Sequence, residues 1–307
     1  MSKILVTGGA GFIGSHVVDA YVAARHEVIV VDNLSSGRRE QVPPNVRFAE
    51  MDIRDPSLRS VFERERPQVV NHHAAQSSVS VSVSNPRLDA EVNIIGTINL
   101  LTHCLEFKTR RVVFASTGGA IYGEPDRIPV DENHPARPIS PYGLSKLVGE
   151  LYLQEFSRRG LEWAVLRYSN VYGPRQDPHG EAGVVAIFAQ AMLEGRTPTI
   201  FGDGGQTRDF VYVEDIAAAN VRALDAPPGQ ITNIGTGTAT TVNDLFKKLA
   251  DLCGFRGKAT YAAPRAGDVK HIALSVARAK AWLKWTPQVG LDEGLSRTVG
   301  WFRSKKV

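Results

Sequence analysis

Short apolar runs and amphipathic stretches alternate along the first half of the chain. Apolar runs of strand length lie at residues 3–7, 27–31, 46–50, 68–71, 111–115 and 161–167. The stretches between them, such as 15–24 and 54–66, place apolar residues at helical spacing. Strands and helices that alternate through short loops form a parallel sheet with helices on both faces. We therefore expect an α/β protein with a doubly wound parallel sheet.

The regular alternation ends after Asn170. Residues 173–183 are rich in glycine, proline and charge, which predicts a loop, and residues 184–195 have helical spacing. Two short apolar runs follow at 197–201 and 210–213. The second half is therefore expected to be less regular than the first.

Residues 77–84 alternate serine and valine, which is the period of a strand. An Asn-Pro pair and a helical stretch that reaches residue 107 follow at once. Because that context does not suit a sheet strand, we expect an irregular crossing or a short helix here.

A glycine cluster lies between the first strand and the first helix. Gly8 allows a tight turn, Gly11 lets the backbone approach a pyrophosphate, and Gly14 lets the helix pack close to the strand. Asp32 ends the next strand about 20 residues later, where a carboxylate can hold the adenosine ribose hydroxyls. A carboxylate also repels a 2′-phosphate, so the pattern predicts dinucleotide binding and favours NAD over NADP.

Other strand ends supply further candidate residues. Asp52 and Ile53 are placed to meet an adenine ring, and the small Ala74-Ala75 pair suits backbone that passes close to a cofactor. Arg38 and Arg39 follow Asp32 in a loop and keep NADP open as an alternative. Ligands of parallel sheets bind at the carboxyl ends of the strands, where all of these residues lie.

A tyrosine and a lysine four residues apart form the candidate catalytic pair. Ser140 is a helix-capping residue and Pro141 suits the first helical position. Tyr142 and Lys146 then share one helix face, and the ammonium is expected to lower the pKa of the phenol. A tyrosine with a lowered pKa can act as a general base. The spacing alone is common, but this helix begins at the same end of the sheet as the glycine cluster.

Composition narrows the function further. The chain has 307 residues, 43% of them hydrophobic and 22% charged, and a formal net charge of +4 with no basic run, so nucleic-acid binding receives no support. Cys104 and Cys253 are expected to be thiols rather than a disulfide. His72 and His73 lack a nearby third ligand, so we expect no metal site. No apolar run approaches the ~20 residues of a membrane span, which predicts a cytoplasmic protein.

Taken together, the motifs resemble the extended short-chain dehydrogenase/reductases, and within them the UDP-glucose (UDP-galactose) 4-epimerases. The matching segments follow in order over nearly the whole chain: residues 7–14, 32–37, 52–53, 116–117, 142–146, 168–174, 201–204, 208–211 and 233–237. The resemblance implies a Rossmann domain of residues 1–169 plus about 208–230. A smaller α/β substrate-binding domain would then comprise residues 170–207 and 231–307.

The resemblance also implies a mechanism. NAD stays bound, Tyr142 takes the proton of the sugar 4-hydroxyl, and the sugar passes through a transient 4-keto intermediate. Lys146 would hold the nicotinamide ribose, and Thr117, or Ser116 beside it, would bond the reacting oxygen. Related 4,6-dehydratases carry an Asp-Glu pair where this chain has Gly118-Gly119, so a dehydratase is disfavoured.

Carried over residue by residue, the resemblance gives two sets of binding residues. The cofactor set is Gly8, Gly11, Phe12, Ile13, Gly14, Asp32, Asn33, Ser35, Ser36, Gly37, Asp52, Ile53, Ala74, Ala75, Gln76, Asn93, Tyr142, Lys146 and Ser169. The substrate set is Thr117, Tyr142, Asn170, Val184, Thr199, Arg208, Arg265 and Asp268. The arginines would bind the diphosphate of a UDP-sugar, because their planar fork matches phosphate oxygens.

Several alternatives stay open at this point. Ile272 stands where some relatives carry a bulky tyrosine, so UDP-N-acetylglucosamine is an alternative substrate, as is UDP-glucuronate. The base could be uridine or thymidine. A reductase uses the same site, whereas a non-catalytic nucleotide-binding regulator would be expected to lack Tyr142 or Lys146. Helices at 88–107 and 142–159 imply, by resemblance, a homodimer through a four-helix bundle.

Overall fold

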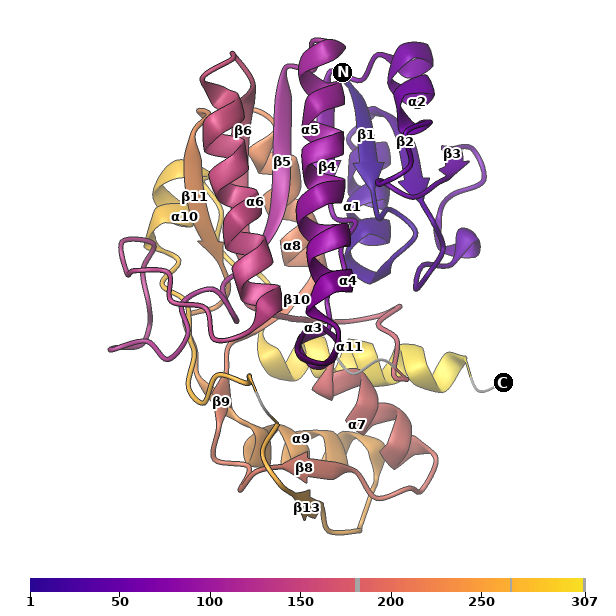
Figure 1. Cartoon of the computed structure of the whole chain (residues 1–307). Helices are drawn as coiled ribbons and strands as arrows, with labels where there is room; N and C mark the ends of the chain where they lie inside the picture. Colours follow the sequence, from indigo (N-terminus) through magenta and orange to yellow (C-terminus); the bar gives the residue numbers. More distant parts are fainter. Residues whose placement is uncertain (180–182, 266, 306–307) are drawn as a thin grey trace.

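A seven-stranded parallel sheet forms the centre of the molecule (Figure 1). The computed structural model describes residues 1–179, 183–265 and 267–305. The strand order is β11-β6-β5-β4-β1-β2-β3, and every neighbouring pair is parallel. The strands are β1 (Lys3–Thr7), β2 (Glu27–Asp32), β3 (Arg47–Glu50), β4 (Val69–His72), β5 (Arg111–Thr117), β6 (Glu162–Tyr168) and β11 (Gln230–Ile234). The predicted doubly wound sheet is confirmed.

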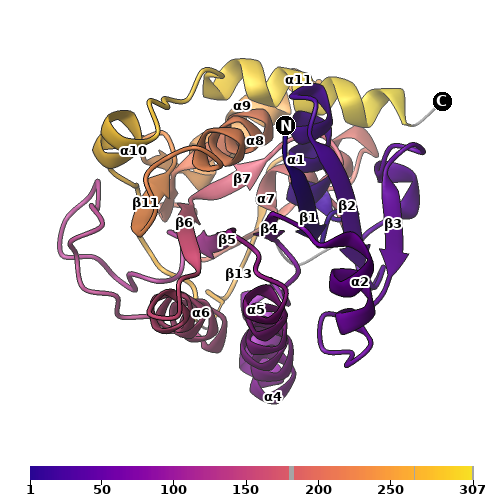
Figure 2. The same ribbon diagram turned by 90° about the horizontal axis from the view of Figure 1, so that it is seen from above.

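Helices cover both faces of this sheet (Figure 2). One face carries α2 (Leu58–Glu65), α5 (Gly96–Glu106) and α6 (Pro141–Ser157), and the other carries α1 (Phe12–Ala23), α8 (Val213–Ala223) and α10 (Ala277–Trp282). Because side chains of a strand alternate between faces, Ile4 and Val6 join one apolar core while Leu5 joins the other. Burial on both faces explains why the strands read as continuous apolar runs.

The serine-valine segment forms α3 (Val79–Ser84), as the alternative to a strand predicted. Its N-cap is Ser78, whose hydroxyl accepts a hydrogen bond from the backbone N–H of Val81 at 3.1 Å. The long helix expected next is made of α4 (Pro86–Ala90), a π-helical turn η2 (Glu91–Ile95) and α5. A short 3-10 turn, η1 (Arg39–Gln41), follows β2.

A smaller lobe packs below the carboxyl end of the sheet in Figure 1. Its core lies among three helices and the short strands beside them. Its elements are β7 (Asn170–Tyr172), α7 (Val184–Leu193), β8 (Thr199–Phe201), β9 (Thr207–Arg208), β10 (Phe210–Tyr212), β12 (Thr240–Thr241), α9 (Val242–Cys253), β13 (Thr260–Ala262) and α11 (Leu291–Ser304). Residues 180–182 of the predicted loop lie outside the described residues.

The expected domain division stays a prediction, but one detail of it needs correction. The boundary near residue 230 falls at the start of β11, and β11 pairs with β6 as a strand of the central sheet. In addition, Ala279 of α10 is buried in the core beneath that sheet. The part of the chain after residue 231 is therefore shared between the two lobes.

Two smaller observations complete the fold. Cys104 and Cys253 are both free thiols, the first buried and the second half-buried, as predicted. Among the described residues, no helix combines the length and the apolar character needed to cross a lipid bilayer.

Candidate active site

A cleft of about 1490 Å³ opens between the carboxyl end of the sheet and the smaller lobe. The glycine turn, the ends of several strands, the start of α6 and residues of the smaller lobe line it. Strand order reverses at β1, which lies between β2 and β4, and such a reversal creates a crevice in open α/β sheets. Pockets for one small ligand usually measure about 300–1,000 Å³. The cleft is therefore large enough for two ligands side by side.

The glycine turn leaves no room for side chains at two positions. Gly8 has a φ of +69°, and a Cβ there would lie 2.6 Å from the backbone nitrogen of Ala74. A Cβ on Gly14 would lie 2.1 Å from the carbonyl oxygen of Gly8. Gly11 differs, because its nearest neighbour would be 3.3 Å away and its open side faces the cleft. The N-terminus of α1 begins directly after it, which suits a pyrophosphate.

Asp32 is buried at the edge of this turn. One of its carboxylate oxygens accepts a hydrogen bond from the N–H of Ala10 at 2.9 Å, and the other accepts from the N–H of Leu34 at 2.8 Å. A carboxylate oxygen has two lone pairs, so each retains capacity to accept a ribose hydroxyl. Of the two loop arginines, Arg38 lines the cleft, whereas Arg39 stacks on Phe48.

The Asp52 carboxylate is held by hydrogen bonds from two side chains. Arg54 donates from Nε and Nη2 to the two carboxylate oxygens, at 2.9 and 2.8 Å, and Asn33 donates to the same carboxylate at 2.8 Å. The hydrogen bonds from Arg54 lower the pKa of Asp52 to about 2. Ile53 follows with its side chain buried, so this strand end presents a fixed edge to the cleft.

Tyr142 stands in the first turn of α6, where its placement follows from the predicted cap. The Ser140 hydroxyl accepts a hydrogen bond from the N–H of Gly143 at 3.2 Å, and Pro141 occupies the first helical position. The side chain of Thr117 hydrogen-bonds Tyr142. Burial nevertheless raises the pKa of Tyr142 to about 12, and the hydrogen bond from Thr117 offsets this only in part. The predicted lowering of this pKa by Lys146 is therefore wrong for the protein alone.

Lys146 is buried one helical turn further along α6. Its ammonium donates to the carbonyl oxygen of Ala115 at 3.0 Å and lies 5.1 Å from the centre of the Phe114 ring. Burial lowers the pKa of Lys146 to about 8, against the opposing attraction of Asp89 and Glu150. Because its hydrogen bond goes to the end of β5, the ammonium is held at the cleft rather than free in solvent.

The structure also separates Ser116 from Thr117. Ser116 donates its hydroxyl proton to the buried carboxylate of Glu150 at 2.6 Å, whereas the side chain of Thr117 reaches Tyr142. Ser116 therefore serves the protein interior, although it lines the wall of the cleft. Its assignment as a catalytic residue stays a prediction.

Arg208, on β9 of the smaller lobe, is one of the cations that line the cleft. Its side chain is 15% exposed, donates to the carbonyl oxygen of Thr207 at 2.9 Å and approaches Asp268 at 3.9 Å. Burial lowers the pKa of Arg208 from its ordinary value, although an arginine stays charged. A buried charge with a weak partner is suited to bind an anion such as a diphosphate.

Most of the predicted residues line this cleft. From the cofactor set, they are Gly8, Gly11, Phe12, Ile13, Gly14, Asp32, Asn33, Ser35, Ser36, Asp52, Ile53, Ala74, Ala75, Gln76, Tyr142, Lys146 and Ser169. From the substrate set, they are Thr117, Tyr142, Asn170, Val184, Arg208 and Asp268.

Two residues predicted to bind the cofactor do not line the cleft. Gly37 packs against Ala10, and a Cβ there would approach the Ala10 backbone to 2.9 Å. Asn93 is buried, accepts a hydrogen bond from the N–H of Gln76 at 2.9 Å and donates to the Gln76 carbonyl oxygen at 2.9 Å. Asn93 therefore supports Gln76, which lines the cleft, and the assignment of Gly37 and Asn93 as cofactor-binding residues stays a prediction.

Two predicted substrate residues also lie outside the cleft. Thr199 is exposed on β8, and its hydroxyl is 2.9 Å from that of Thr260 on β13. Arg265 places its guanidinium 4.1 Å from the centre of the Phe201 ring. Ile272 is fully buried in a neighbouring apolar cluster and does not line the cleft either.

Residues of the loop after β7 line the cleft and were missed. Arg175 forms an ion pair with Asp19 at 2.7 Å, and both Arg175 Nη1 and Gln176 Oε1 are buried without a hydrogen-bond partner among the described residues. Ser169 Oγ and Asn170 Oδ1 are in the same state. Buried polar atoms without partners are rare, so their gathering on one wall fits a polar ligand. The composition of residues 173–183 predicted a loop over the active site, but no periodic signal singled out Arg175 or Gln176.

His73 adds a neutral ring to the same wall. Its Nε2 lies 3.2 Å from the Tyr168 hydroxyl, and the two rings stack. Burial, with repulsion from Lys146, lowers the pKa of His73 to about 3, so the ring carries no charge at neutral pH. Within the described parts of the chain, no three histidine, cysteine or carboxylate side chains gather to hold a metal ion.

Comparison with known proteins agrees with this geometry. The NAD dependent epimerase/dehydratase family matches residues 4–235. A UDP-glucose 4-epimerase of Mycolicibacterium smegmatis is 44% identical over 310 residues, which cover 99% of each chain.

Solved structures agree as well. The UDP-glucose 4-epimerase of Thermotoga maritima with UDP-glucose superposes with a TM-score of 0.98 at 50% identity, over 99% of this chain and 100% of that one. The UDP-glucose 4-epimerase of Thermus thermophilus in complex with NAD gives 0.94 at 48% identity, over 98% and 99% of the two chains. Since the family match covers most of the chain and these relatives cover nearly all of it, the chain belongs to the NAD dependent epimerase/dehydratase family.

Proposed function

We propose that this protein is an NAD-dependent UDP-hexose 4-epimerase that interconverts UDP-galactose and UDP-glucose. The observation that carries the proposal is the contact of Tyr142 with Thr117, one helical turn from the buried Lys146, within a cleft large enough for two ligands. Full-length relatives named UDP-glucose 4-epimerase support the same substrate.

The residues of the sheet end fit a bound dinucleotide. The turn is closed by backbone contacts at Gly8 and Gly14 but open toward the cleft at Gly11, where a pyrophosphate would approach, and Asp32 has lone pairs left for ribose hydroxyls. The Ser169 hydroxyl, which has no partner among the described residues, lies on the same wall. When bound, NAD supplies the acceptor and donor of a hydride, and its positive charge favours the phenolate form of a nearby tyrosine.

Tyr142 is then the group that exchanges a proton with the sugar 4-hydroxyl. Thr117 holds the phenol in place and can bond the same sugar oxygen. Lys146 adds a positive charge that is fixed by the carbonyl of Ala115, and this charge opposes protonation of the phenolate during turnover.

Arg208 and Asp268 would bind the nucleotide part of the substrate. The guanidinium can offer a planar pair of donors to the diphosphate, while Asp268 accepts from a hydroxyl or a base. A dehydratase is disfavoured, since Gly118 and Gly119 stand where related dehydratases carry an Asp-Glu pair, and a glycine has no side chain that could transfer a proton.

The oligomer that we propose is a homodimer in which α4, α5 and α6 pair with their copies as a four-helix bundle. Ile95, Leu144 and Leu151 on this side are 57%, 52% and 54% exposed. Large aliphatic side chains that share one helical surface favour a protein partner over solvent.

The test is a substrate comparison. The protein with added NAD is incubated separately with UDP-galactose, UDP-N-acetylgalactosamine and UDP-galacturonate, and the anomeric proton signals of the 4-epimers are followed. We expect UDP-galactose to be converted with the highest kcat/KM. Conversion of only the N-acetylated sugar, or only the uronate, would replace the hexose as the substrate.

A further inference from the structure

Three consecutive residues of β5 each contact α6, at helix positions spaced by four. Lys146 donates to the carbonyl oxygen of Ala115, the side chain of Thr117 bonds Tyr142, and Ser116 donates to Glu150. Residues spaced by four share one face of a helix. The end of β5 and the catalytic face of α6 are therefore joined by a continuous row of hydrogen bonds, of which Glu150 is the inner end.

Glu150 also binds Arg167 on the neighbouring strand β6. Arg167 donates from Nε and Nη2 to the two carboxylate oxygens, at 2.9 and 2.6 Å. The two side chains are 1% and 5% exposed. Moving both charges out of water costs about as much as their attraction returns, so such a pair is weak evidence of added stability. Its bidentate form does fix the position of the carboxylate.

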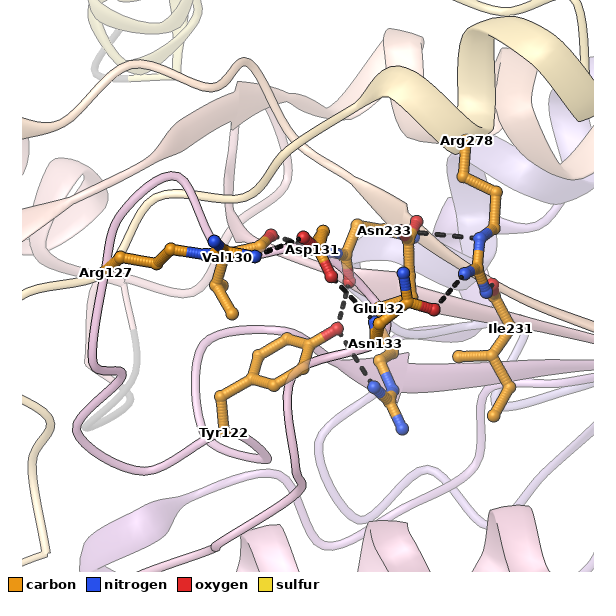
Figure 3. A network of polar contacts seen from close by, with 10 residues as sticks. Tyr122, Arg127, Val130, Asp131, Glu132, Asn133, Ile231, Asn233 and Arg278 are labelled. Carbon is orange, nitrogen blue, oxygen red and sulfur yellow. Dashed lines mark hydrogen bonds and ion pairs between the residues drawn. The ribbon is translucent and has the colours of Figure 1, made fainter.

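Arg167 also hydrogen-bonds a second polar network, of which Figure 3 labels Tyr122, Asn233, Glu132 and Arg278. Its Nη1 donates to the Tyr122 hydroxyl at 2.9 Å, and that hydroxyl donates to Asn233 Oδ1 at 2.7 Å. The N–H of Asn233 donates to the buried carboxylate of Glu132 at 2.8 Å, which Arg278 approaches at 3.5 Å. The guanidinium that positions Glu150 is therefore anchored to β11 and α10.

We propose that Glu150 is a positioning residue for the reaction. Anchored by Arg167, it fixes the Ser116 hydroxyl and thereby the end of β5, so that Thr117 meets Tyr142 at a constant distance. The proposal rests on the function proposed above, since it concerns the same proton transfer. Glu150 itself lies behind the cleft wall and touches no substrate.

Glu150 has a second effect through its charge. The charged or titratable groups that act on Lys146 are Asp89 of α4, Glu150 of α6, and His72 and His73 at the end of β4. Burial lowers the pKa of both histidines, so they are neutral during turnover. The two carboxylates favour the protonated lysine, and removal of one of them lowers the pKa of Lys146 further below about 8.

The experiment compares Glu150→Gln with Glu155→Gln. Glu155 lies on the same helix but is exposed and pairs with Arg159, so its substitution is the matched control. For Glu150→Gln we expect kcat to fall about 10- to 100-fold while KM for the UDP-sugar changes less than about twofold. The alkaline limb of the kcat profile should move to lower pH, because Lys146 loses its proton earlier. The control should keep the original kcat and profile.

A second variant separates positioning from folding. Ser116→Ala removes one hydrogen bond and leaves the charge of Glu150, so kcat should fall while the alkaline limb stays in place. If Glu150→Gln does not fold, Ser116→Ala decides the proposal, and an unchanged kcat overturns it. An unchanged pH profile in folded Glu150→Gln also overturns it. If the natural protein converts none of the UDP-sugars, the proposed function fails, and the positioning role fails with it. If the natural protein is active but the variants behave as just described, only the positioning role fails.

Discussion

At Tyr142, burial and hydrogen bonding act on the phenol in opposite directions. Burial raises its pKa to about 12, and the bond to Thr117 offsets this only in part. Lys146 responds to the same burial with a pKa lowered to about 8. Burial thus favours the neutral form of both side chains: the tyrosine holds its proton more firmly, and the lysine loses its own more readily, than in water.

The first prediction concerns the phenol itself. Tyr142→Phe removes the proton acceptor and should lower kcat by about 10²- to 10⁴-fold, the usual contribution of general acid–base catalysis. The free energy of unfolding should change little, because the substitution keeps the packed ring and removes only one hydrogen bond, the one to Thr117. Assays of UDP-galactose conversion measure kcat, and urea unfolding measures the free energy of unfolding. A variant with full activity would exclude Tyr142 as the base.

A second prediction concerns Lys146 and the pH dependence of stability. Its folded pKa of about 8 is lower than the ordinary value of 10.5, so the unfolded chain binds more protons between these pH values. Stability therefore rises with pH in this window, by an amount on the order of 3 kcal/mol from this group. The penalty is full below pH 8 and is gone above pH 10.5.

Urea unfolding at several pH values, with Lys146→Met as the comparison, measures this term. The difference in unfolding free energy between the two proteins should shrink as pH rises from 8 to 10.5. Parallel pH curves for the two proteins would show that the lysine has its ordinary pKa.

At the scale of elements, the glycine turn must both pack closely and leave space for a ligand, and different glycines meet these two requirements. A Cβ on Gly14 would meet backbone inside the turn at 2.1 Å, whereas Gly11 has open space on its cleft side. Gly14 therefore allows the strand, the turn and α1 to pack closely, whereas Gly11 leaves space for a pyrophosphate to approach the backbone.

The matched pair Gly14→Ala and Gly11→Ala tests this division. Gly14→Ala should lower the free energy of unfolding by about 1–3 kcal/mol or more, since the clash is with backbone. Gly11→Ala should cost less than about 1 kcal/mol in stability but weaken NAD binding at least about tenfold. Calorimetric titration with NAD and thermal unfolding give both values. Equal NAD affinity in Gly11→Ala and the natural protein would contradict the assignment.

The elements that sequence predicted best were those with strong local signals. The strand, turn and helix around Gly8 to Gly14, and the capped start of α6, follow from residues close together in the chain. The partnerless atoms of Arg175 and Gln176 could not be predicted, because they arise where an irregular loop meets the sheet end. Likewise, only the fold shows that Ser116 turns to Glu150 and that burial raises the pKa of the Tyr142 phenol.

For the whole molecule, the apolar surface of α4, α5 and α6 is the feature that the single chain leaves unexplained. Leu144 and Leu151 are 52% and 54% exposed on α6, the helix that carries the candidate catalytic pair. A partner copy on this surface would immobilise α6 from outside, just as Glu150 holds it from inside.

A charge on this surface tests the dimer. Leu151→Glu should raise the dimer dissociation constant at least about tenfold, or about 1.4 kcal/mol, because a carboxylate would be buried without a partner. Tyr261→Glu, at an exposed aromatic residue on β13 in the smaller lobe, is the control and should leave the molecular mass of the assembly in solution unchanged. Sedimentation equilibrium measures both. A Leu151→Glu protein that sediments like the natural one would place the interface elsewhere.

Epimerisation within one cleft is tested most directly by following the fate of hydrogen at C4. UDP-galactose deuterated at C4 is incubated with the protein and NAD in ordinary water, and the product is examined by nuclear magnetic resonance, with Tyr142→Phe in parallel. We predict UDP-glucose that retains deuterium at C4, and almost no product with the variant. No UDP-glucose, or UDP-glucose whose C4 deuterium has been replaced from water, would contradict this mechanism.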